Sequence, residues 1–376
     1  MIYFDNAATT YPKPSSVLAS AVLAMKKYSF NSGRGGYKES IKAGEMIYSV
    51  REKVASMFGF EPQNVAFTKN CTEALNMAIK GSVKSGDHII ISSLEHNSVS
   101  RVAEKLFDDG IIDYDIAKYS YNDDETVANF ENLIKPNTTL VVCMHSSNAF
   151  GVTFPVAKIG KMCKLHGIRF VVDGAQGAGV ADINAKRDNI DILCAPGHKC
   201  LLGAMGTGFI AVKDGLKLST VEEGGTGSNS MSLKQPDFLP DRLEAGTLNN
   251  SGIASLGKGI DYINSYGTEA IYNHELSLMQ YIYKALENIN DVALYTPFPE
   301  QGKTMPIISF NFGNYSSEKT AAILAKNDIC TRAGFHCTPL AHKHFGTTDR
   351  GTVRISFGMF NTHRDCDALI NVVKKF

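Results

Sequence analysis

The sequence predicts an α/β protein, with a large domain built on a mostly parallel sheet flanked by helices and a smaller α+β domain after it. From about residue 40 to 213, helical periodicity alternates with short, bounded apolar runs, the pattern of βαβ units with strands buried on both faces. From residue 308 onwards, strand-like runs instead alternate apolar and polar residues between helical stretches, which is typical of an α+β unit.

The elements follow in order from local signals. Ile47, Val50 and Val54 repeat at helical spacing until Gly59, which predicts a helix ended by a glycine C-cap. Apolar runs predict strands at residues 65–67, 88–92, 140–145, 169–173, 191–195 and 208–212. In the second domain we expect helices at 253–266, at 270–286 and from Ser317, with strands at 308–312 and 353–357.

A Gly-rich stretch between residues 221 and 250 interrupts the periodicity and indicates a domain junction, because long ordered loops of this kind are usually functional. We expect residues 14–248 to form the large domain. Residues 1–13 and 249–376 are expected to form the small one. The length of 376 residues fits two domains at ~150 residues each.

The composition excludes several classes of protein. Hydrophobic residues make up 44% and charged residues 20%, so neither a disordered chain nor a fibrous repeat is expected. Lys+Arg and Asp+Glu both count 38, and a balanced chain lacks the overall field that gathers nucleic acid or an anionic membrane. We therefore expect neither as a partner.

The location and redox state are predicted from the first residues and the cysteines. No basic segment followed by an apolar stretch opens the sequence, and no apolar run reaches the ~18 residues that span a bilayer, so we expect a cytoplasmic protein. Eight cysteines show no regular spacing and no C-x-x-C, which argues against a disulfide framework. Most should be buried, reduced thiols.

Ligands of open parallel sheets bind outside the carboxyl ends of the strands, and polar residues follow several of the predicted strands. Asn70 and Glu73 resemble a capping box at a helix N-terminus, which can bind an anion such as phosphate. Asp173 ends a strand where burial would call for a positive partner, although an Asp that starts a turn is the commoner case.

Lys199 lies between Gly197 and Gly203, and close-approach glycines favour a partly desolvated amine that can form a Schiff base. A lysine in a surface turn is the ordinary alternative. His96 offers a flat ring after another strand, and Asn148 follows a fourth. A phosphate site, an acid, a lysine and a flat ring together are what pyridoxal 5′-phosphate (PLP) requires of a protein.

The second domain adds a cysteine in a polar loop. Cys337 follows His336, with Gly334 and Arg332 upstream, so nearby positive charge can stabilise its thiolate. A metal site is the alternative, with His336, Cys337, His342 and His344 as its ligands. In the last predicted strand Arg354 points away from the apolar face, where it can bind a substrate carboxylate or simply be solvated.

The sequence resembles the cysteine desulfurases of the class V aminotransferase group, PLP enzymes of fold type I. The resemblance runs nearly end to end and rests on motifs in family order: Tyr3-Phe-Asp-Asn-Ala-Ala, Thr72-Glu73, Glu95-His-Asn97, Asn148-x-x-Gly151, Val172-Asp-Gly-Ala-Gln176, Gly197-His-Lys199, Glu244-Ala-Gly-Thr247, Arg332-x-Gly-x-His-Cys337 and Arg354-x-Ser356 to Asn361-Thr362. The short segment 337–345 is similar to the SUF-like group, often linked to iron–sulfur cluster assembly.

The resemblance implies a role for each matching residue. Lys199 would hold PLP as a Schiff base, Asp173 would pair with the pyridine nitrogen, and His96 would stack on the ring. Gln176 would reach the phenolic oxygen, with Asn148 nearby. The phosphate would be held by Thr72 with Cys71 beside it, by His198, and by Thr247 of the other subunit of a homodimer.

For the substrate, the resemblance implies that Arg354 binds the carboxylate of L-cysteine, with Asn148 and Ala8 close by. Cys337 would take the sulfur as a persulfide, release L-alanine and pass the sulfur to an acceptor protein. Four positions depart from the family pattern. Pro196 and Cys71 replace hydroxyl residues at the phosphate, which would weaken its binding, and Gly33 and Phe335 would alter either proton handling near the substrate or the docking of a sulfur acceptor.

Other functions stay open from the sequence alone. Selenocysteine lyase is the same chemistry on a softer atom. A PLP-dependent aminotransferase or lyase without sulfur transfer would leave Cys337 incidental. A non-enzymatic sulfur carrier or metal-binding protein would have no need of Lys199, Asp173 and His96 together.

Overall fold

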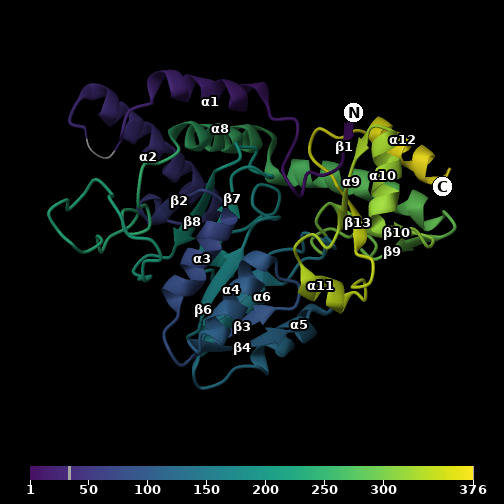
Figure 1. Cartoon of the computed structure of the whole chain (residues 1–376), viewed down its shortest axis with the longest axis horizontal. Coiled ribbons are helices and arrows are strands. Elements are labelled where there is room, and N and C mark those ends of the chain that lie inside the picture. Colours follow the sequence, from purple (N-terminus) through teal and green to yellow (C-terminus); the bar gives the residue numbers. More distant parts are fainter. Residues whose placement is uncertain (33–34, 376) are drawn as a thin grey trace.

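A sheet of seven strands forms the centre of the computed structural model, which describes residues 1–32 and 35–375 (Figure 1). Its order is β2-β8-β7-β6-β5-β3-β4. The strands are β2 (Val65–Thr68), β3 (Asp87–Ser92), β4 (Ile112–Ala117), β5 (Thr138–Met144), β6 (Arg169–Asp173), β7 (Ile192–Pro196) and β8 (Gly208–Val212). All neighbours pair in parallel except β8, which is antiparallel to both β2 and β7.

Helices cover both faces of this sheet. On one face, α3 (Cys71–Ser82) and α4 (Asn97–Asp108) pack on side chains such as Ile89 and Val142. On the other, α2 (Lys38–Phe58) and α6 (Val156–His166) pack on side chains such as Ile90 and Phe170. The short helices η1 (Pro62–Asn64), α5 (Asp123–Glu131) and α7 (Ala185–Asp188) complete this part of the chain. Because consecutive strand residues face opposite layers, both layers need apolar side chains.

A second, antiparallel sheet follows, with the order β12-β13-β10-β9. Its strands are β9 (Val292–Leu294), β10 (Ile307–Phe312), β12 (Arg332–Gly334) and β13 (Thr352–Ser356), and the helices around it are α9 (Thr268–Glu287), α10 (Ser317–Lys326), α11 (Pro339–His344) and α12 (His363–Val373). The long helix α8 (Asn250–Tyr266) packs along α1 (Ser15–Lys27), as Figure 1 shows.

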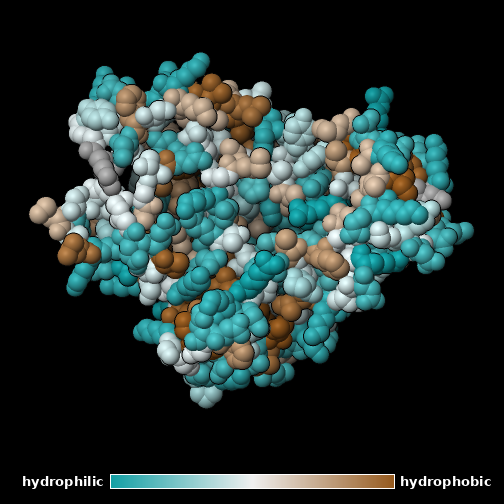
Figure 2. Space-filling model, in the orientation of Figure 1, coloured by the Kyte–Doolittle hydropathy of each residue, from teal (hydrophilic) through white to brown (hydrophobic). Residues whose placement is uncertain are grey.

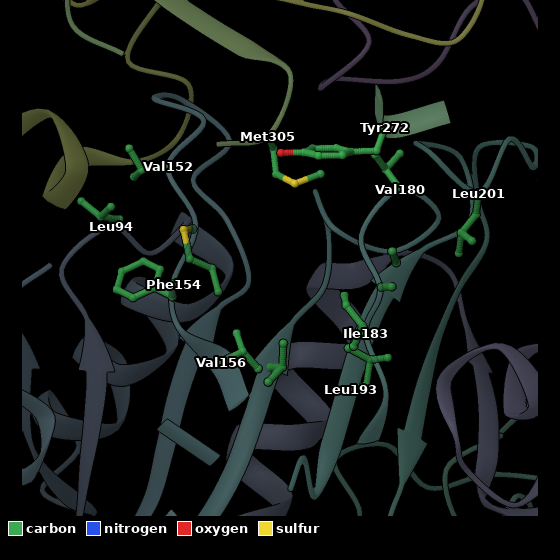
Figure 3. Packing of buried hydrophobic residues seen from close by; sticks show 14 of the residues in the cluster. Leu94, Val152, Phe154, Val156, Val180, Ile183, Leu193, Leu201, Tyr272 and Met305 are labelled. Atoms are coloured by element: carbon green, nitrogen blue, oxygen red, sulfur yellow. The ribbon is translucent and has the colours of Figure 1, made fainter. Parts of the chain in front are cut away.

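The apolar core continues from the large sheet into the second half of the chain. Figure 3 shows Tyr272 and Met305 on one side of this cluster and Ile183 and Leu193 on the other. The residues involved are buried, and burial of each large apolar side chain contributes about 1.5–3 kcal/mol. In the described part of the chain, helices of spanning length lack the apolarity that a bilayer crossing requires.

The first residues join the two sheets. β1 (Ile2–Tyr3) pairs in parallel with β11 (Ile329–Cys330), and Ser356 N donates to Phe4 O at 2.7 Å. Residues 5–13, which we call the N-terminal strap, then cross to the segment that follows β7, where Thr10 N donates to His198 O. The strap therefore contacts both halves of the molecule.

The structure confirms the α/β class and every strand and helix expected from the sequence, with shifts of a few residues at their ends. The helix with Ile47 and Val54 does end at a left-handed Gly59, with φ 79°. β4 was not expected, because Asp113 and Asp115 interrupt its apolar run; it is an edge strand, paired on one side only, and tolerates exposed charges.

Candidate functional site

A cavity of about 110 Å³ lies at the carboxyl ends of β5, β6 and β7. The strand register brings Met144, Asp173 and Cys194 side by side, so the residues that follow these strands converge. Eight of the residues expected at a cofactor line this cavity: Cys71, Thr72, His96, Asn148, Asp173, Gln176, His198 and Lys199. The topology thus assembles a site that the sequence scatters over 129 positions.

Asp173 is the buried acid of the site. One oxygen of its carboxylate accepts from Ala175 N at 2.8 Å and from Cys71 Sγ at 3.5 Å. Burial raises its pKa, while the Ala175 N–H and the positive charge of Lys199 act in the opposite direction. The positive neighbour that the sequence called for is therefore Lys199, while the bond from Ala175 N is the contact of a turn. Cys71 turns its thiol to this carboxylate.

Lys199 follows β7 in a tight turn that needs its glycines. A Cβ on Gly203 would lie 2.8 Å from Gly197 O, and Gly203 N donates to that oxygen at 2.7 Å. Burial lowers the pKa of Lys199, and the carboxylate of Asp173 opposes that effect. A buried amine with a lowered pKa is more readily uncharged and nucleophilic than a surface lysine.

His96 is the N-cap of α4, and its ring is held by the helix. Ser98 N donates to His96 Nδ1 at 3.1 Å, so in the neutral ring the proton sits on Nε2. Burial, reinforced by the charges of Lys199 and Arg332, lowers the pKa of His96 to about 4. The ring is therefore neutral at pH 7.

One end of the cavity is formed by the N-terminus of α3 and by His198. Asn70 Oδ1 accepts from Glu73 N at 2.9 Å, as expected of a cap. The predicted reciprocal bond is wrong by one residue, because Glu73 accepts from Lys69 N at 2.5 Å and not from Asn70 N. His198 Nδ1 is buried without a hydrogen-bond partner among the described residues, and burial lowers the pKa of His198 to about 4.

Arg354 is fully buried in β13, which excludes a solvated guanidinium. Its Nη1 donates to Asn148 O at 2.8 Å and its Nη2 to Asp5 Oδ1 at 2.6 Å. Within the described residues, Arg354 Nε and Asn148 Oδ1 are buried without a partner. Ala8 N donates to Asp5 O at 3.0 Å, so Ala8 lies in the turn that follows the Arg354 partner Asp5.

The loop that carries Cys337 is docked against α4. Asn97 N donates to Cys337 O at 2.8 Å, and Asn148 Nδ2 donates to His336 O at 2.9 Å. His336 and Cys337 both have left-handed backbones, with φ 48° and 58°, a conformation that costs a non-glycine residue of order 1 kcal/mol or more. Cys337 is exposed, and the loop holds it beside the helix that His96 caps.

The histidines near Cys337 make other contacts than the metal alternative requires. His336 Nε2 lies 3.1 Å from Thr352 O, and His342 Nδ1 lies 2.7 Å from Thr347 Oγ1. In the described part of the chain, no three His, Cys, Asp or Glu side chains converge as metal ligands. Phe335, one of the departures from the family pattern, is exposed and packs edge-on against His342.

Thr247 does not line this cavity. Its loop is anchored by Glu244, which forms a buried ion pair with Arg51 and accepts from Phe67 N at 2.6 Å.

Of the other departures from the family pattern, Pro196 ends β7 and lines the cavity, whereas Gly33 lies outside the described residues. Five cysteines are buried and two are half-buried, as expected for most of them, and Cys337 is exposed.

The burial of two acids escaped the sequence reasoning. Glu95, which precedes His96 in its motif, is fully buried, and its Oε1 accepts from Ser92 Oγ and Met144 N; burial raises its pKa to about 8. Glu275 of α9 is buried beside Cys200, and burial raises its pKa to about 8 as well. An alternating or helical pattern gives no sign of such acids, because only tertiary packing buries them.

A larger cavity, of about 660 Å³, lies at the opposite edge of the sheet. Its charged residues are largely satisfied within the protein: Lys213 pairs with Asp191 at 2.9 Å and Lys186 with Glu61 at 3.3 Å. It holds none of the residues expected at a cofactor. It lies at the amino ends of the parallel strands, whereas ligands of such sheets bind at the carboxyl ends. The smaller cavity is the candidate active site.

Comparison with known proteins gives consistent matches. The family model described as "Aminotransferase class-V" matches residues 2–369. A probable cysteine desulfurase of Methanothermobacter thermautotrophicus is 30% identical, over 98% of this chain and 92% of its own. A cysteine desulfurase of Escherichia coli is 29% identical, over 100% of this chain and 93% of its own. The apo structure of a cysteine desulfurase from Thermococcus onnurineus has a TM-score of 0.93 at 31% identity, over 100% of this chain and 94% of that one.

Proposed function

The chain belongs to the class-V aminotransferase family and, within it, to the cysteine desulfurases, and we propose that it uses PLP to move the sulfur of L-cysteine onto Cys337. One observation carries the proposal. Lys199, Asp173 and His96 share a cavity whose neighbouring helix α4 holds the Cys337 loop through Asn97 N.

The side chains of the cavity fit PLP. The unpaired, buried His198 Nδ1 and the N-terminus of α3 with Thr72 would hold the phosphate. Asp173 would hold a proton at the pyridine nitrogen, Lys199 Nζ would bind the aldehyde carbon, and the neutral ring of His96 would cover one face. When bound, PLP withdraws electrons from the bonds at the substrate's Cα.

Arg354 and Asn148 fit the substrate carboxylate. Arg354 Nε is buried without a partner among the described residues, and a carboxylate there would accept from it. Asp5 already occupies Nη2, so the substrate would share the guanidinium with a resident carboxylate. We propose that this shared binding orients the cysteine side chain towards the Cys337 loop.

The chain's own residues then perform the transfer. Lys199 Nζ, freed from the cofactor, would take the proton from the substrate's Cα and later return one. The Cys337 thiolate would attack the substrate sulfur, so that an S–S bond forms as the Cβ–S bond breaks. The products balance as L-alanine and a persulfide on Cys337, whose exposed position lets an acceptor protein take the sulfur.

We also propose a homodimer. Leu18, Val22 and Met25 of α1 expose roughly half or more of their surface, and Figure 2 shows apolar side chains gathered over this helix. Met231 and Leu233, in the loop before α8, are almost fully exposed. A second copy covering these side chains could bring its Thr247 to the cofactor, a residue that does not line the cavity of its own chain. Light scattering at micromolar concentration tests this: a monomeric mass would contradict it.

Two finer points belong to the same proposal. Eight free thiols suit a reducing compartment, which supports the cytoplasm. The large domain, residues 14–248, and the small domain, residues 1–13 with 249–376, are proposed as the units that carry the cofactor and the cysteine loop.

The purified protein tests the main proposal directly. We expect visible absorbance from bound PLP, and alanine released from L-cysteine in amounts matched by sulfur delivered to a thiol acceptor. Transfer of the amino group to a keto acid without release of sulfur would overturn the desulfurase proposal. A colourless protein that PLP cannot reconstitute would overturn the cofactor proposal.

A further inference from the structure

Three donors converge on a single carbonyl oxygen next to Lys199. Lys13 Nζ donates to His198 O at 2.5 Å, Thr9 Oγ1 at 3.1 Å and Thr10 N at 3.2 Å. All three come from the N-terminal strap, 185 or more residues away along the chain. A carbonyl oxygen has two lone pairs, so this one is saturated, and the shortest contact comes from a charged donor.

The His198 carbonyl belongs to the peptide unit that joins His198 to Lys199. Because that unit is planar, a carbonyl fixed in space also fixes the direction in which the Lys199 backbone leaves it. On the other side, Leu202 N donates to Lys199 O at 2.8 Å. Hydrogen bonds within the turn thus restrain one side of Lys199, and the strap restrains the other side through the His198 carbonyl.

We propose that Lys13 is a positioning residue for Lys199, holding through the His198 carbonyl the peptide plane from which the cofactor lysine projects. The proposal rests on the function proposed above, in which Lys199 binds PLP. Lys13 does not touch the cofactor and is not a catalytic residue.

The surroundings of Lys13 support this role over a purely stabilising one. Lys13 is half-buried, and desolvation lowers its pKa to about 8, with the neighbouring Cys200 acting in the opposite direction. Desolvation of the ammonium thus opposes the gain from the hydrogen bond to His198 O. A methionine of similar length would keep the packing of the aliphatic stem. Because Lys13→Met removes the ammonium, we expect it to change the alignment of the turn more than the stability of the fold.

The experiment compares Lys13→Met with Lys13→Arg and with the matched control Lys217→Met, an exposed lysine after β8 at the opposite edge of the sheet. We expect PLP to leave Lys13→Met about tenfold faster than wild type, the effect of one lost charge-assisted hydrogen bond. Lys13→Arg, which keeps a charged donor, should retain PLP within about threefold. The urea midpoint of each PLP-free protein should stay at the wild-type value.

Two outcomes would overturn the proposal. One is wild-type retention of PLP in Lys13→Met. The other is a fall in the urea midpoint of the PLP-free Lys13→Met protein, with unchanged PLP release from the molecules that remain folded. Failure of the underlying function is distinguishable, because borohydride reduction of the wild-type protein would then attach the pyridoxyl group to a lysine other than Lys199. Thr9→Val, which removes a neutral donor, should show a smaller effect than Lys13→Met.

Discussion

Arg354 Nη2 donates to the carboxylate of Asp5 at 2.6 Å, across 349 residues of sequence. The pair places a strap residue at the point where the substrate carboxylate is expected. Because Arg354 is buried and also bonded to Asn148 O, its guanidinium has a fixed orientation. The predictions below begin from this arrangement.

Arg354→Lys should weaken the binding of cysteine while leaving PLP in place. A lysine keeps the charge but loses the planar fork that serves Asp5, Asn148 and the substrate together. We expect KM for cysteine to rise about tenfold or more, the effect of at least one charge-assisted hydrogen bond. The exposed Arg364→Lys is the control, and equal KM values in the two variants would contradict the assignment.

Lys199→Ala should abolish covalent attachment of PLP. Its amine is the one that the turn between Gly197 and Gly203 holds in the cavity. After borohydride reduction, peptide mapping of the wild-type protein should find the pyridoxyl group on Lys199, and the variant should carry none. Lys213→Ala, at the other edge of the sheet, should behave as wild type. A label on another lysine would make the assignment wrong.

Asp173→Asn should keep PLP bound but slow the chemistry. A neutral amide no longer holds the pyridine nitrogen protonated, so abstraction of the Cα proton loses its electron sink. We expect kcat to fall at least about a hundredfold, within the range of lost acid–base and electrostatic contributions, with a smaller change in KM. Wild-type turnover in this variant would show that the carboxylate only organises the turn at Ala175.

Cys337→Ser should release no sulfur, although PLP absorbance persists. In the wild-type protein, one turnover without an acceptor should leave one extra sulfur atom on Cys337, as measured by mass spectrometry of its peptide. Cys330→Ser is the matched control, because Cys330 is a half-buried cysteine on the neighbouring strand β11. Extra sulfur on a different cysteine would refute the assignment of Cys337.

Glu275 should make the protein less stable as pH rises. The unfolded carboxyl ionises near its ordinary pKa of 4.5, whereas burial raises the folded pKa to about 8. Between these values the folded state keeps a proton that the unfolded state releases. The free energy of unfolding should therefore fall with rising pH, by up to about 1.4 kcal/mol per pH unit.

Glu275→Gln removes this titration with little change of shape. Urea unfolding of the PLP-free protein, measured at several pH values between 5 and 8, should give a shallower slope for the variant. The exposed Glu287→Gln on the same helix should keep the wild-type slope. Identical slopes in all three proteins would mean that Glu275 does not titrate in this range.

The sequence was sufficient for the parts of the fold that depend on local pattern. Buried strands such as β6 and β8 have continuous apolar runs, and the sheet rule then located Asp173 and Lys199 at one edge. β4 could not be found in this way, because an edge strand accepts the charges of Asp113 and Asp115. The periodicity of apolar residues shows which face of a strand or helix is buried, but it does not show which strands pair.

The site shows the same limit. His96 and Asn148 follow predicted strands, so their approach to Lys199 followed from topology. The bond from Arg354 to Asp5 and that from Lys13 to His198 join distant segments, and a single sequence carries no signal of such pairs. The docking of Cys337 onto Asn97 is likewise a property of the three-dimensional arrangement, in which a left-handed backbone turns the loop.

The N-terminal strap also constrains when the site can be completed on the ribosome. Asp5 and Lys13 are translated before their partners: Lys13 must wait 185 residues for His198, and Asp5 must wait 349 residues for Arg354. At about 5–20 residues per second, the second wait lasts on the order of 20 to 70 s. A nascent chain can therefore build most of the large sheet before Arg354 exists, and the bond between Asp5 and Arg354 forms only after β13 has been translated.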